Sequence, residues 1–398
     1  MSRVKVNSIT PFTGQNINFG GHAVPSGSNK NLGSETQAWT ELYVSTGSVN
    51  FVAPITLGQP TVVVATLRAG GEGNTAGVST GQIFTETNGN LRGSFSVGRN
   101  NIASGTASLA NGRFNTASGL WSHAEGESTF AHTRAHSEGT STTASGDSSH
   151  AEGVFTRATA TGAHSEGYYT TASGVNSHAE GEGTIASGIR AHAEGNYSIA
   201  SGIASHAEGN GGFASGSYSH AEGNLTTASG DYSPAEGSNT IASGVGSHAE
   251  GLSTTASGQG AHAEGSNTIA SGQYSHAEGL QNLASGNHSH AQGYLATSSG
   301  ANSFASGLGV VATASYQVVV GQYNTLTNTS SIFVVGAGVS NLRKDGFSVE
   351  SDGTKAHIVI PANQQLPNNP KQGSMFFNQD TNMLYIHNGT AWRSASFS

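Results

Sequence analysis

Histidine and glutamate recur together along the central part of this 398-residue chain, in segments such as SHAEG. Twelve of the 17 histidines and twelve of the 24 acidic residues belong to these segments. Imidazole nitrogens and carboxylate oxygens can transfer protons, pair with one another or bind divalent metal ions. The candidate chemistry is therefore proton transfer, ion pairing or metal binding, repeated at a regular spacing.

Serine precedes many of these histidines, so Ser177, His178 and Glu180 have the residue types of a hydrolase triad. Adjacent residues on a β-strand point to opposite faces, which keeps Ser177 and His178 from meeting readily. An enzyme also rarely needs a dozen copies of one triad. We therefore expect no catalytic residues and no enzymatic activity.

An internal repeat must position these side chains. From Ser94 to Asn302 the chain consists of fifteen consecutive units of equal length, except that one of them, Ser122 to Arg134, is a single residue shorter. A typical unit, Ser177 to Arg190 (SHAEGEGTIASGIR), divides into two halves of the form (S/T)xAxG, whose small residues alternate with larger ones as in a β-strand. Two short strands and two turns per unit predict an all-β fold. Each unit would form one coil of a parallel β-solenoid, with successive coils about 4.8 Å apart.

Glycine occupies fixed positions in this unit. Position 5 is glycine in all fifteen units, and position 12 is glycine in thirteen, with Thr133 and Ala160 as the exceptions. Both positions follow a predicted strand, where a tight turn needs a positive φ or a close approach of two backbones. The turn glycines that we assign in three successive units are Gly181, Gly188, Gly195, Gly202, Gly209 and Gly216.

Position 2 is histidine and position 4 is glutamate in twelve units each, and Pro234 interrupts the histidines. Stacked glutamates about 4.8 Å apart would repel by about 3 kcal/mol per pair at an effective dielectric constant near 20. We therefore expect histidine and glutamate to share a face and to hydrogen-bond laterally, between strands or between subunits, which predicts a stability that changes between about pH 5 and 8. The residues assigned to this structural ladder are His178, Glu180, His192, Glu194, His206, Glu208, His220, Glu222, His248, Glu250, His262, Glu264, His276 and Glu278.

A column of zinc or nickel sites is the alternative use of the same side chains. A metal site needs convergent geometry that spacing alone does not establish, so we predict no metal and no cofactor. Threonine pairs such as Thr142-Thr143 suggest an ice-binding surface, but other residues replace threonine at the same positions of many units, so the threonines do not form regular rows. The turns also lack the aspartates of repeat-toxin calcium sites.

The 14-residue coil with SxAxG halves resembles the head repeat of the trimeric autotransporter adhesins, the YadA-like left-handed parallel β-roll. The commonest coil of that family is similar to NSVAIG, so His178 and Glu180 stand where the family has two aliphatic residues. The resemblance covers about half of the chain. It implies that three chains form a homotrimeric rod.

Segments of different composition flank the repeats. We expect residues 1–93 to form a β-rich attachment region, because Asn31 to Phe51 looks like short β modules of phage tail-fibre and virion-fibre proteins. We assign residues 94–316 to the β-roll. Residues 317–355 are expected to form its cap or neck, because they are similar to the segment that closes YadA-like rolls in phage structural proteins.

The last segment, residues 356–398, contains two apolar and aromatic stretches around turn signals. This pattern predicts a small β-hairpin module. Its aromatic residues Phe377, Tyr385 and Trp392 either form a minimal core or contact a receptor at the tip of a fibre.

Net charge and hydrophobicity exclude other classes of protein. The formal charge of −9 argues against nucleic-acid binding, which depends on Lys and Arg that neutralise phosphates. No apolar run approaches the length of a membrane helix, and Met1 to Thr10 is not followed by the apolar stretch of a signal peptide. The chain contains no cysteine, so disulfides do not stabilise it.

Together these features predict a structural protein, a homotrimeric fibre of a phage tail or head that is exposed to the extracellular medium. We expect one end, the N-terminal one, to contact other virion proteins. The fibre would attach the particle to a host-surface receptor or act as a spacer. The alternative is a bacterial trimeric surface adhesin, which the repeats alone suggest but which a missing signal peptide and membrane anchor disfavour.

Overall fold

The computed structural model describes residues 94–326, 330–351, 355–359, 362–363, 370–378, 380–381 and 383–395. Within these residues every regular element is a β-strand and none is a helix, so the expected all-β fold is confirmed. The attachment region expected at residues 1–93 lies outside the described residues.

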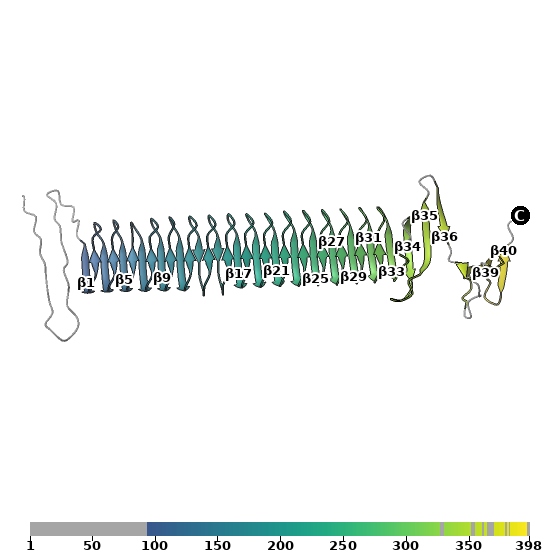
Figure 1. The fold of residues 1–398 in the computed structure, drawn as a ribbon, viewed down its shortest axis with the longest axis horizontal. Coiled ribbons are helices and arrows are strands. Elements are labelled where there is room, and N and C mark those ends of the chain that lie inside the picture. Colours follow the sequence, from purple (N-terminus) through teal and green to yellow (C-terminus); the bar gives the residue numbers. More distant parts are fainter. Residues whose placement is uncertain are drawn as a thin grey trace, which may run out of the picture. The chain divides into compact units, whose positions relative to one another are not determined.

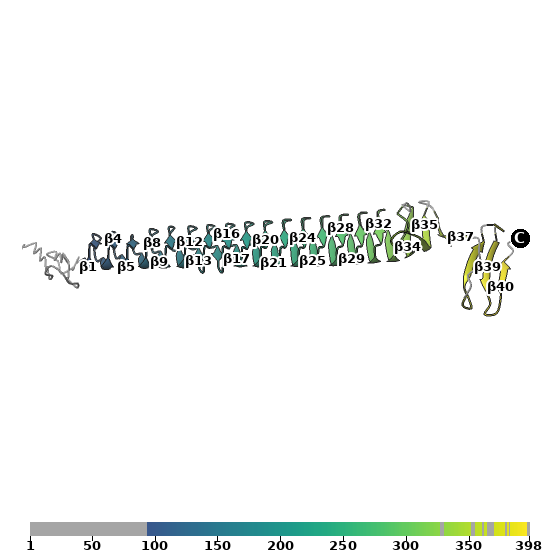
Figure 2. The same cartoon turned by 60° about the horizontal axis from the view of Figure 1, so that its bottom comes forward.

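Residues 94–326 and 330–337 form a parallel β-solenoid, whose coils supply a long-strand position and a short-strand position (Figures 1 and 2). The predicted solenoid of 14-residue coils is therefore confirmed. The strands at the long-strand positions are β1 (Phe95–Arg99), β3 (Leu109–Arg113), β5 (His123–Glu127), β7 (His136–Thr140), β9 (His150–Val154), β11 (His164–Tyr168), β13 (His178–Ala179), β15 (His192–Ala193), β17 (His206–Asn210), β19 (His220–Asn224), β21 (Pro234–Ser238), β23 (His248–Leu252), β25 (His262–Ser266), β27 (His276–Leu280), β29 (His290–Tyr294), β31 (Phe304–Leu308) and β33 (Val318–Gln322).

A second parallel sheet contains the short strands, each of two residues, and its register also advances by one coil per strand. The short strands are β2 (Ile102–Ala103), β4 (Thr116–Ala117), β6 (Phe130–Ala131), β8 (Thr143–Ala144), β10 (Arg157–Ala158), β12 (Thr171–Ala172), β14 (Ile185–Ala186), β16 (Ile199–Ala200), β18 (Phe213–Ala214), β20 (Thr227–Ala228), β22 (Ile241–Ala242), β24 (Thr255–Ala256), β26 (Ile269–Ala270), β28 (Leu283–Ala284), β30 (Thr297–Ser298) and β32 (Val311–Ala312).

The interior of the roll is built from small side chains. Positions 1, 3, 8 and 10 of the coil point inward, as in Ser205, Ala207, Gly212 and Ala214. The alanine columns at positions 3 and 10 are fully buried over most of the roll. Serine at position 1 is satisfied locally in several coils, as where the Ser205 hydroxyl donates to the Gly202 carbonyl oxygen at 2.9 Å. Because no large side chain separates them, the two sheets can pack closely.

Besides the glycine at position 5, the residues at positions 7 and 14 of each coil adopt a backbone conformation with positive φ. Most of them are not glycine, and examples are Tyr197 (φ 53°), Ala204 (φ 52°) and Tyr218 (φ 58°). This left-handed conformation costs a non-glycine residue about 1 to 2 kcal/mol. Backbone hydrogen bonds to the preceding coil hold these turns, for example from the Tyr197 N–H to the Glu182 carbonyl at 2.8 Å.

The parallel stacking continues beyond the last repeat recognised in the sequence. After Asn302, β31 and β33 continue the long-strand sheet, and β33 pairs in parallel with β34 (Ser331–Ala337). The roll therefore extends past residue 316, into the segment assigned to the cap. Its closure is antiparallel, because β34 pairs with β35 (Asp345–Ser351) and β35 pairs with β36 (Ala356–Val359).

A separate four-stranded sheet follows near the C-terminus. It consists of β37 (Ala362–Asn363), β38 (Met375–Asn378), β39 (Met383–His387) and β40 (Trp392–Ala395). Strands β38, β39 and β40 are antiparallel, as expected for a small β-hairpin module, and β37 adds a parallel pairing to β38.

Candidate functional site

The ladder histidines lie on the outer surface of the long-strand sheet, because position 2 alternates with the buried positions 1 and 3. Their imidazole rings stack from coil to coil. Ring centroids of His164 and His178 are 4.6 Å apart with an interplanar angle of 1°, and those of His206 and His220 are 4.9 Å apart. The stack runs from His123 to His220 and again from His248 to His290, with Pro234 in the gap.

The ladder glutamates lie beside the histidines on the same outer surface. All but one of these carboxylates, that of Glu222, lie within 4.0 Å of the imidazole of their own coil, of the next coil, or of both. Glu180 is 3.8 Å from the Nε2 atom of His178 through one oxygen and 3.8 Å from that of His192 through the other. We call the outward side chains at positions 2 and 4 from His123 to Gln292 the histidine face.

Few of the close contacts between histidine Nε2 atoms and glutamate oxygens on this face are hydrogen bonds. Among the described ladder residues, the pair of His178 Nε2 and Glu166 Oε1, at 3.2 Å, meets hydrogen-bond geometry. Within one chain, lateral hydrogen bonding between strands is therefore rare along the ladder, although the residues do share a face as expected. Hydrogen bonding between subunits stays a prediction. The stacked rings keep each Nε2 atom in line with the column, 3.3 to 4.0 Å from the nearest carboxylate in the other pairs.

Five ladder histidines are electrostatically biased towards the neutral form. Burial lowers the pKa of the His164 imidazole below its ordinary value, and the neighbouring imidazoles of His178 and His150 lower it further, against the opposing effect of Glu166. Burial followed by histidine neighbours also lowers the pKa of four other ladder histidines. They are His123, His192, His262 and His276.

A neutral imidazole gives the glutamate beside it no strong counter-charge. Positions 2 and 4 contain no Lys or Arg in any of the fifteen repeats. The salt bridges of arginine in the described residues lie outside these two positions, as between Arg134 and Asp147. The histidine face is thus a column of carboxylates beside imidazole nitrogens, which are the donor types of zinc-like metal sites.

The serine of the hydrolase motif is not part of this face. Ser177 is buried in the interior, whereas His178 and Glu180 point outward. The three side chains do not converge on one another. Threonine at position 8 likewise points inward, as at Thr142, which is 0% exposed, so the Thr-Thr pairs do not form a flat outer threonine surface.

The six assigned turn glycines belong to two groups. Gly181, Gly195 and Gly209 have positive φ values, between 91° and 99°. Gly188, Gly202 and Gly216 have no positive φ, and their small size is required by packing. An added Cβ at Gly202 would lie 2.0 Å from the carbonyl oxygen of Gly216 in the next coil.

The C-terminal aromatic residues pack within their own sheet. Trp392 lies against Phe376 and His387, with ring centroids 6.0 and 5.3 Å apart. Phe376 and His387 are 6% and 8% exposed, and the sequence pattern singled out neither. Phe377, Tyr385 and Trp392 are all half-buried, which matches a minimal core better than a fully exposed tip.

The family model of the YadA head domain repeat matches five stretches of the roll, namely residues 165–191, 193–219, 235–261, 249–275 and 284–309. Each stretch spans about two successive coils. These stretches of the roll are therefore similar to YadA head domain repeats, in line with the resemblance found in the sequence. No curated protein matches the chain significantly. In the described part of the chain there is no helix with the length and apolarity required to cross a membrane.

Proposed function

We propose that this chain is the subunit of a homotrimeric virion fibre, of a phage tail or head, that attaches the particle to a host surface or serves as a spacer. The observation on which this rests is the long stack of parallel coils, five stretches of which match the YadA head domain repeat. Because each coil adds about 4.8 Å, a repeat of this kind spans distance with little sequence complexity.

The composition of the roll supports association of three copies. Its interior contains mainly alanine, serine and threonine, so folding of one chain buries little apolar area per residue. Larger apolar side chains remain on the outside of the short-strand sheet, for example Ile185 at 38% exposure and Phe213 at 39%. Packing of three rolls about a common axis would remove one outer surface of each from water.

The segments that follow the roll support a role in attachment. The roll is closed by the antiparallel strands β34, β35 and β36, and a small sheet follows it. We propose that the N-terminal region docks on other virion proteins and that the C-terminal sheet faces a host-surface receptor. In this proposal the protein has no catalytic role, because Ser177 lies on the opposite side of its strand from His178 and Glu180.

A bacterial trimeric surface adhesin is the second candidate, and the match to YadA head repeats favours it. Antibodies against the C-terminal sheet, detected by gold labelling, distinguish the two. Labelled fibres on purified virus particles support the virion fibre. Labelling confined to the outer surface of cells supports the adhesin.

The trimer is tested by light scattering coupled to size-exclusion chromatography of the full-length chain. A mass near three times the chain mass of 40.2 kDa, with the early elution of a rod, is the expected result. A mass near that of one chain would overturn the trimer and leave a solitary solenoid.

A further inference from the structure

We propose that the histidine face binds a row of divalent transition-metal ions of the zinc type. Each ion would be held by the Nε2 atoms of two successive histidines and one carboxylate oxygen of the glutamate beside them. The ligands come from a single chain, so this inference does not depend on the proposed function or on the trimer.

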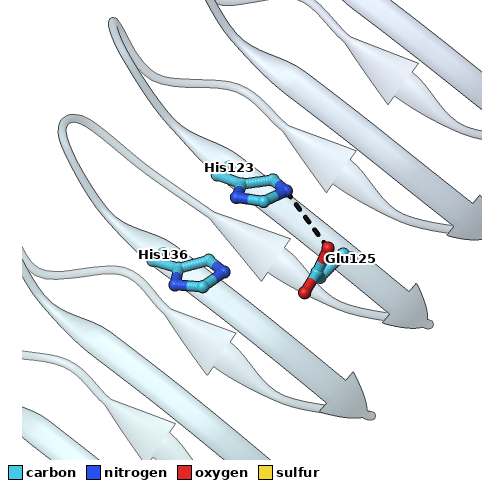
Figure 3. Close-up of side chains that lie close together, drawn as sticks. All are labelled: His123, Glu125 and His136. Atoms are coloured by element: carbon cyan, nitrogen blue, oxygen red, sulfur yellow. Dashed lines mark ion pairs between the residues drawn. The ribbon is translucent and has the colours of Figure 1, made fainter.

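The ligand atoms already lie close together. In the set of His123, Glu125 and His136, one atom from each side chain lies within 4.8 Å of the other two (Figure 3). The His123 Nε2 atom is 3.4 Å from a Glu125 oxygen. Two ligands of a tetrahedral zinc ion, each about 2.1 Å from the metal, are about 3.4 Å apart. Corresponding sets recur along the ladder, including those centred on Glu152, Glu166, Glu250 and Glu264.

A second, independent observation is that the nitrogens aimed into these sets lack partners. The Nε2 atoms of eleven ladder histidines are shielded from solvent and make no hydrogen bond in the described structure. A shielded polar atom without a partner is normally costly, so a recurring one calls for an explanation. These atoms belong to His123, His136, His150, His164, His192, His206, His220, His248, His262, His276 and His290.

The charge and protonation of the face suit a cation. Metal binding needs an imidazole nitrogen without a proton. The nearby carboxylates, with no Lys or Arg at positions 2 and 4, supply negative charge that a divalent ion would offset.

Sharing of ligands limits the number of ions. His164 belongs both to the set with Glu152 and to the set with Glu166, but it has one Nε2 atom to give. The two runs contain eight and four histidines. Taken in pairs, they hold at most four and two ions, hence six per chain. Because stacked rings are 4.6 to 4.9 Å apart, the two rings of a pair must turn towards each other to share an ion.

The test is equilibrium dialysis of the metal-free, untagged full-length protein against zinc at pH 7.5, with cobalt as a spectroscopic substitute. We expect close to six zinc ions per chain and the intense visible absorption of tetrahedral cobalt. Binding of fewer than one ion per chain, or a purely octahedral cobalt spectrum, would overturn the proposal.

A matched pair of double variants tests which histidines are responsible. His262→Gln with His276→Gln interrupts the four-histidine run and should remove two of the six ions. His132→Gln with His288→Gln removes two exposed histidines outside the ladder and should remove none. Equal losses in the two variants would show non-specific binding and refute the proposal. If the first variant fails to fold by circular dichroism, Glu250→Gln with Glu278→Gln replaces it, with the same expected loss, because these carboxylates lie beside the pairs His248–His262 and His276–His290.

Discussion

On the long-strand sheet the outward side chains at positions 2 and 4 are imidazoles and carboxylates, whereas on the short-strand sheet those at positions 9 and 11 are mostly isoleucine, threonine and serine. Both sheets share the same alanine-rich interior and the same register from coil to coil. The coil geometry therefore does not depend on which side chains point outward. We call the second surface the isoleucine–serine face.

The comparison shows that the inward side chains hold the coils together, whereas the outward side chains determine the chemistry of each surface. Interior positions accept only small residues, because the backbones of the two sheets and of successive coils are close. Outer positions are free to vary without loss of the coil, so a single fold presents one titratable, ligand-rich surface and one apolar, hydroxyl-rich surface. Substitutions on each surface and in the shared interior should therefore have effects of different size.

The largest loss of stability is expected at the glycines where the backbones of successive coils approach each other closely, a constraint that applies to both sheets. Gly209→Ala on the long-strand sheet and Gly216→Ala near the short-strand sheet each place a Cβ within 2.2 Å of a carbonyl oxygen in the next coil. We expect each to lower the free energy of unfolding by about 3 kcal/mol. Gly246→Ala is the control, since its φ is 62° but nothing lies near its Cβ, and it should cost about 1 kcal/mol. Denaturant unfolding that gives equal losses for Gly209→Ala and Gly246→Ala would contradict this prediction.

The next effect distinguishes the histidine face by its response to pH. Because the pKa values of five ladder histidines are lowered in the folded protein, the unfolded chain takes up protons first as the pH falls below 6.5. Stability is therefore fully present above pH 6.5 and decreases as the pH falls from 6.5 through the folded pKa values. We expect Tm, measured by circular dichroism, to decrease by a few degrees between pH 7 and 5 in metal-free buffer.

A double variant attributes this pH dependence to one face. His164→Phe with His192→Phe keeps an aromatic ring at both positions and removes two titrating groups. The decrease in Tm should become smaller in this variant and stay unchanged in Ile199→Thr on the isoleucine–serine face. A Tm that rises on acidification would show that the ion pairs outweigh burial.

A smaller effect concerns hydrogen bonding in the shared interior. The Thr184 hydroxyl donates to the Glu180 carbonyl oxygen at 3.0 Å, whereas the Thr226 hydroxyl is buried without a partner in the described structure. We expect Thr184→Val to be about 1 kcal/mol more destabilising than Thr226→Val, which should be neutral or stabilising. Thermal unfolding of the two variants under the same conditions checks this difference, and equal Tm values would refute it.

The smallest effect on folding is expected on the isoleucine–serine face. Ile185→Thr with Ile199→Thr copies the threonine that neighbouring coils carry at position 9, as at Thr171. The change in stability of the single roll should be within about 0.5 kcal/mol. Light scattering on the same variant sharpens the comparison, because loss of the trimer mass would identify this face as the one shared by three copies, and an unchanged mass would point to the histidine face.

Much of the roll could be predicted from the repeat. The alternation of small residues in Ser177 to Gly181 and Thr184 to Gly188 predicted two strands per coil, and the shared face of His178 and Glu180 followed from their spacing of two. The end of the roll was placed too early, because β33 and β34 keep the parallel pairing after the SxAxG pattern has faded. Main-chain hydrogen bonds define that pairing, and they depend little on side-chain identity.

The sequence pattern also predicted the turn residues only in part. The sequence pattern assigned the turns to glycines, but the left-handed residues at positions 7 and 14 include Tyr197 and Ala204. A hydrogen bond to the preceding coil stabilises each, and such contacts exist only once coils stack. The fully buried alanine columns, by contrast, could be read directly from the pattern.

The sequence alone determined the coil length, the register and the side on which each residue lies, because a strict repeat period with alternating small side chains fits one backbone path. Only the tertiary structure decided how the outer side chains meet. Stacking of rings 4.6 to 4.9 Å apart holds the imidazoles parallel, so most His–Glu pairs are close contacts rather than hydrogen bonds, and burial of the stack favours neutral histidine. These properties arise from packing between coils, which are one full repeat apart along the chain but adjacent in space.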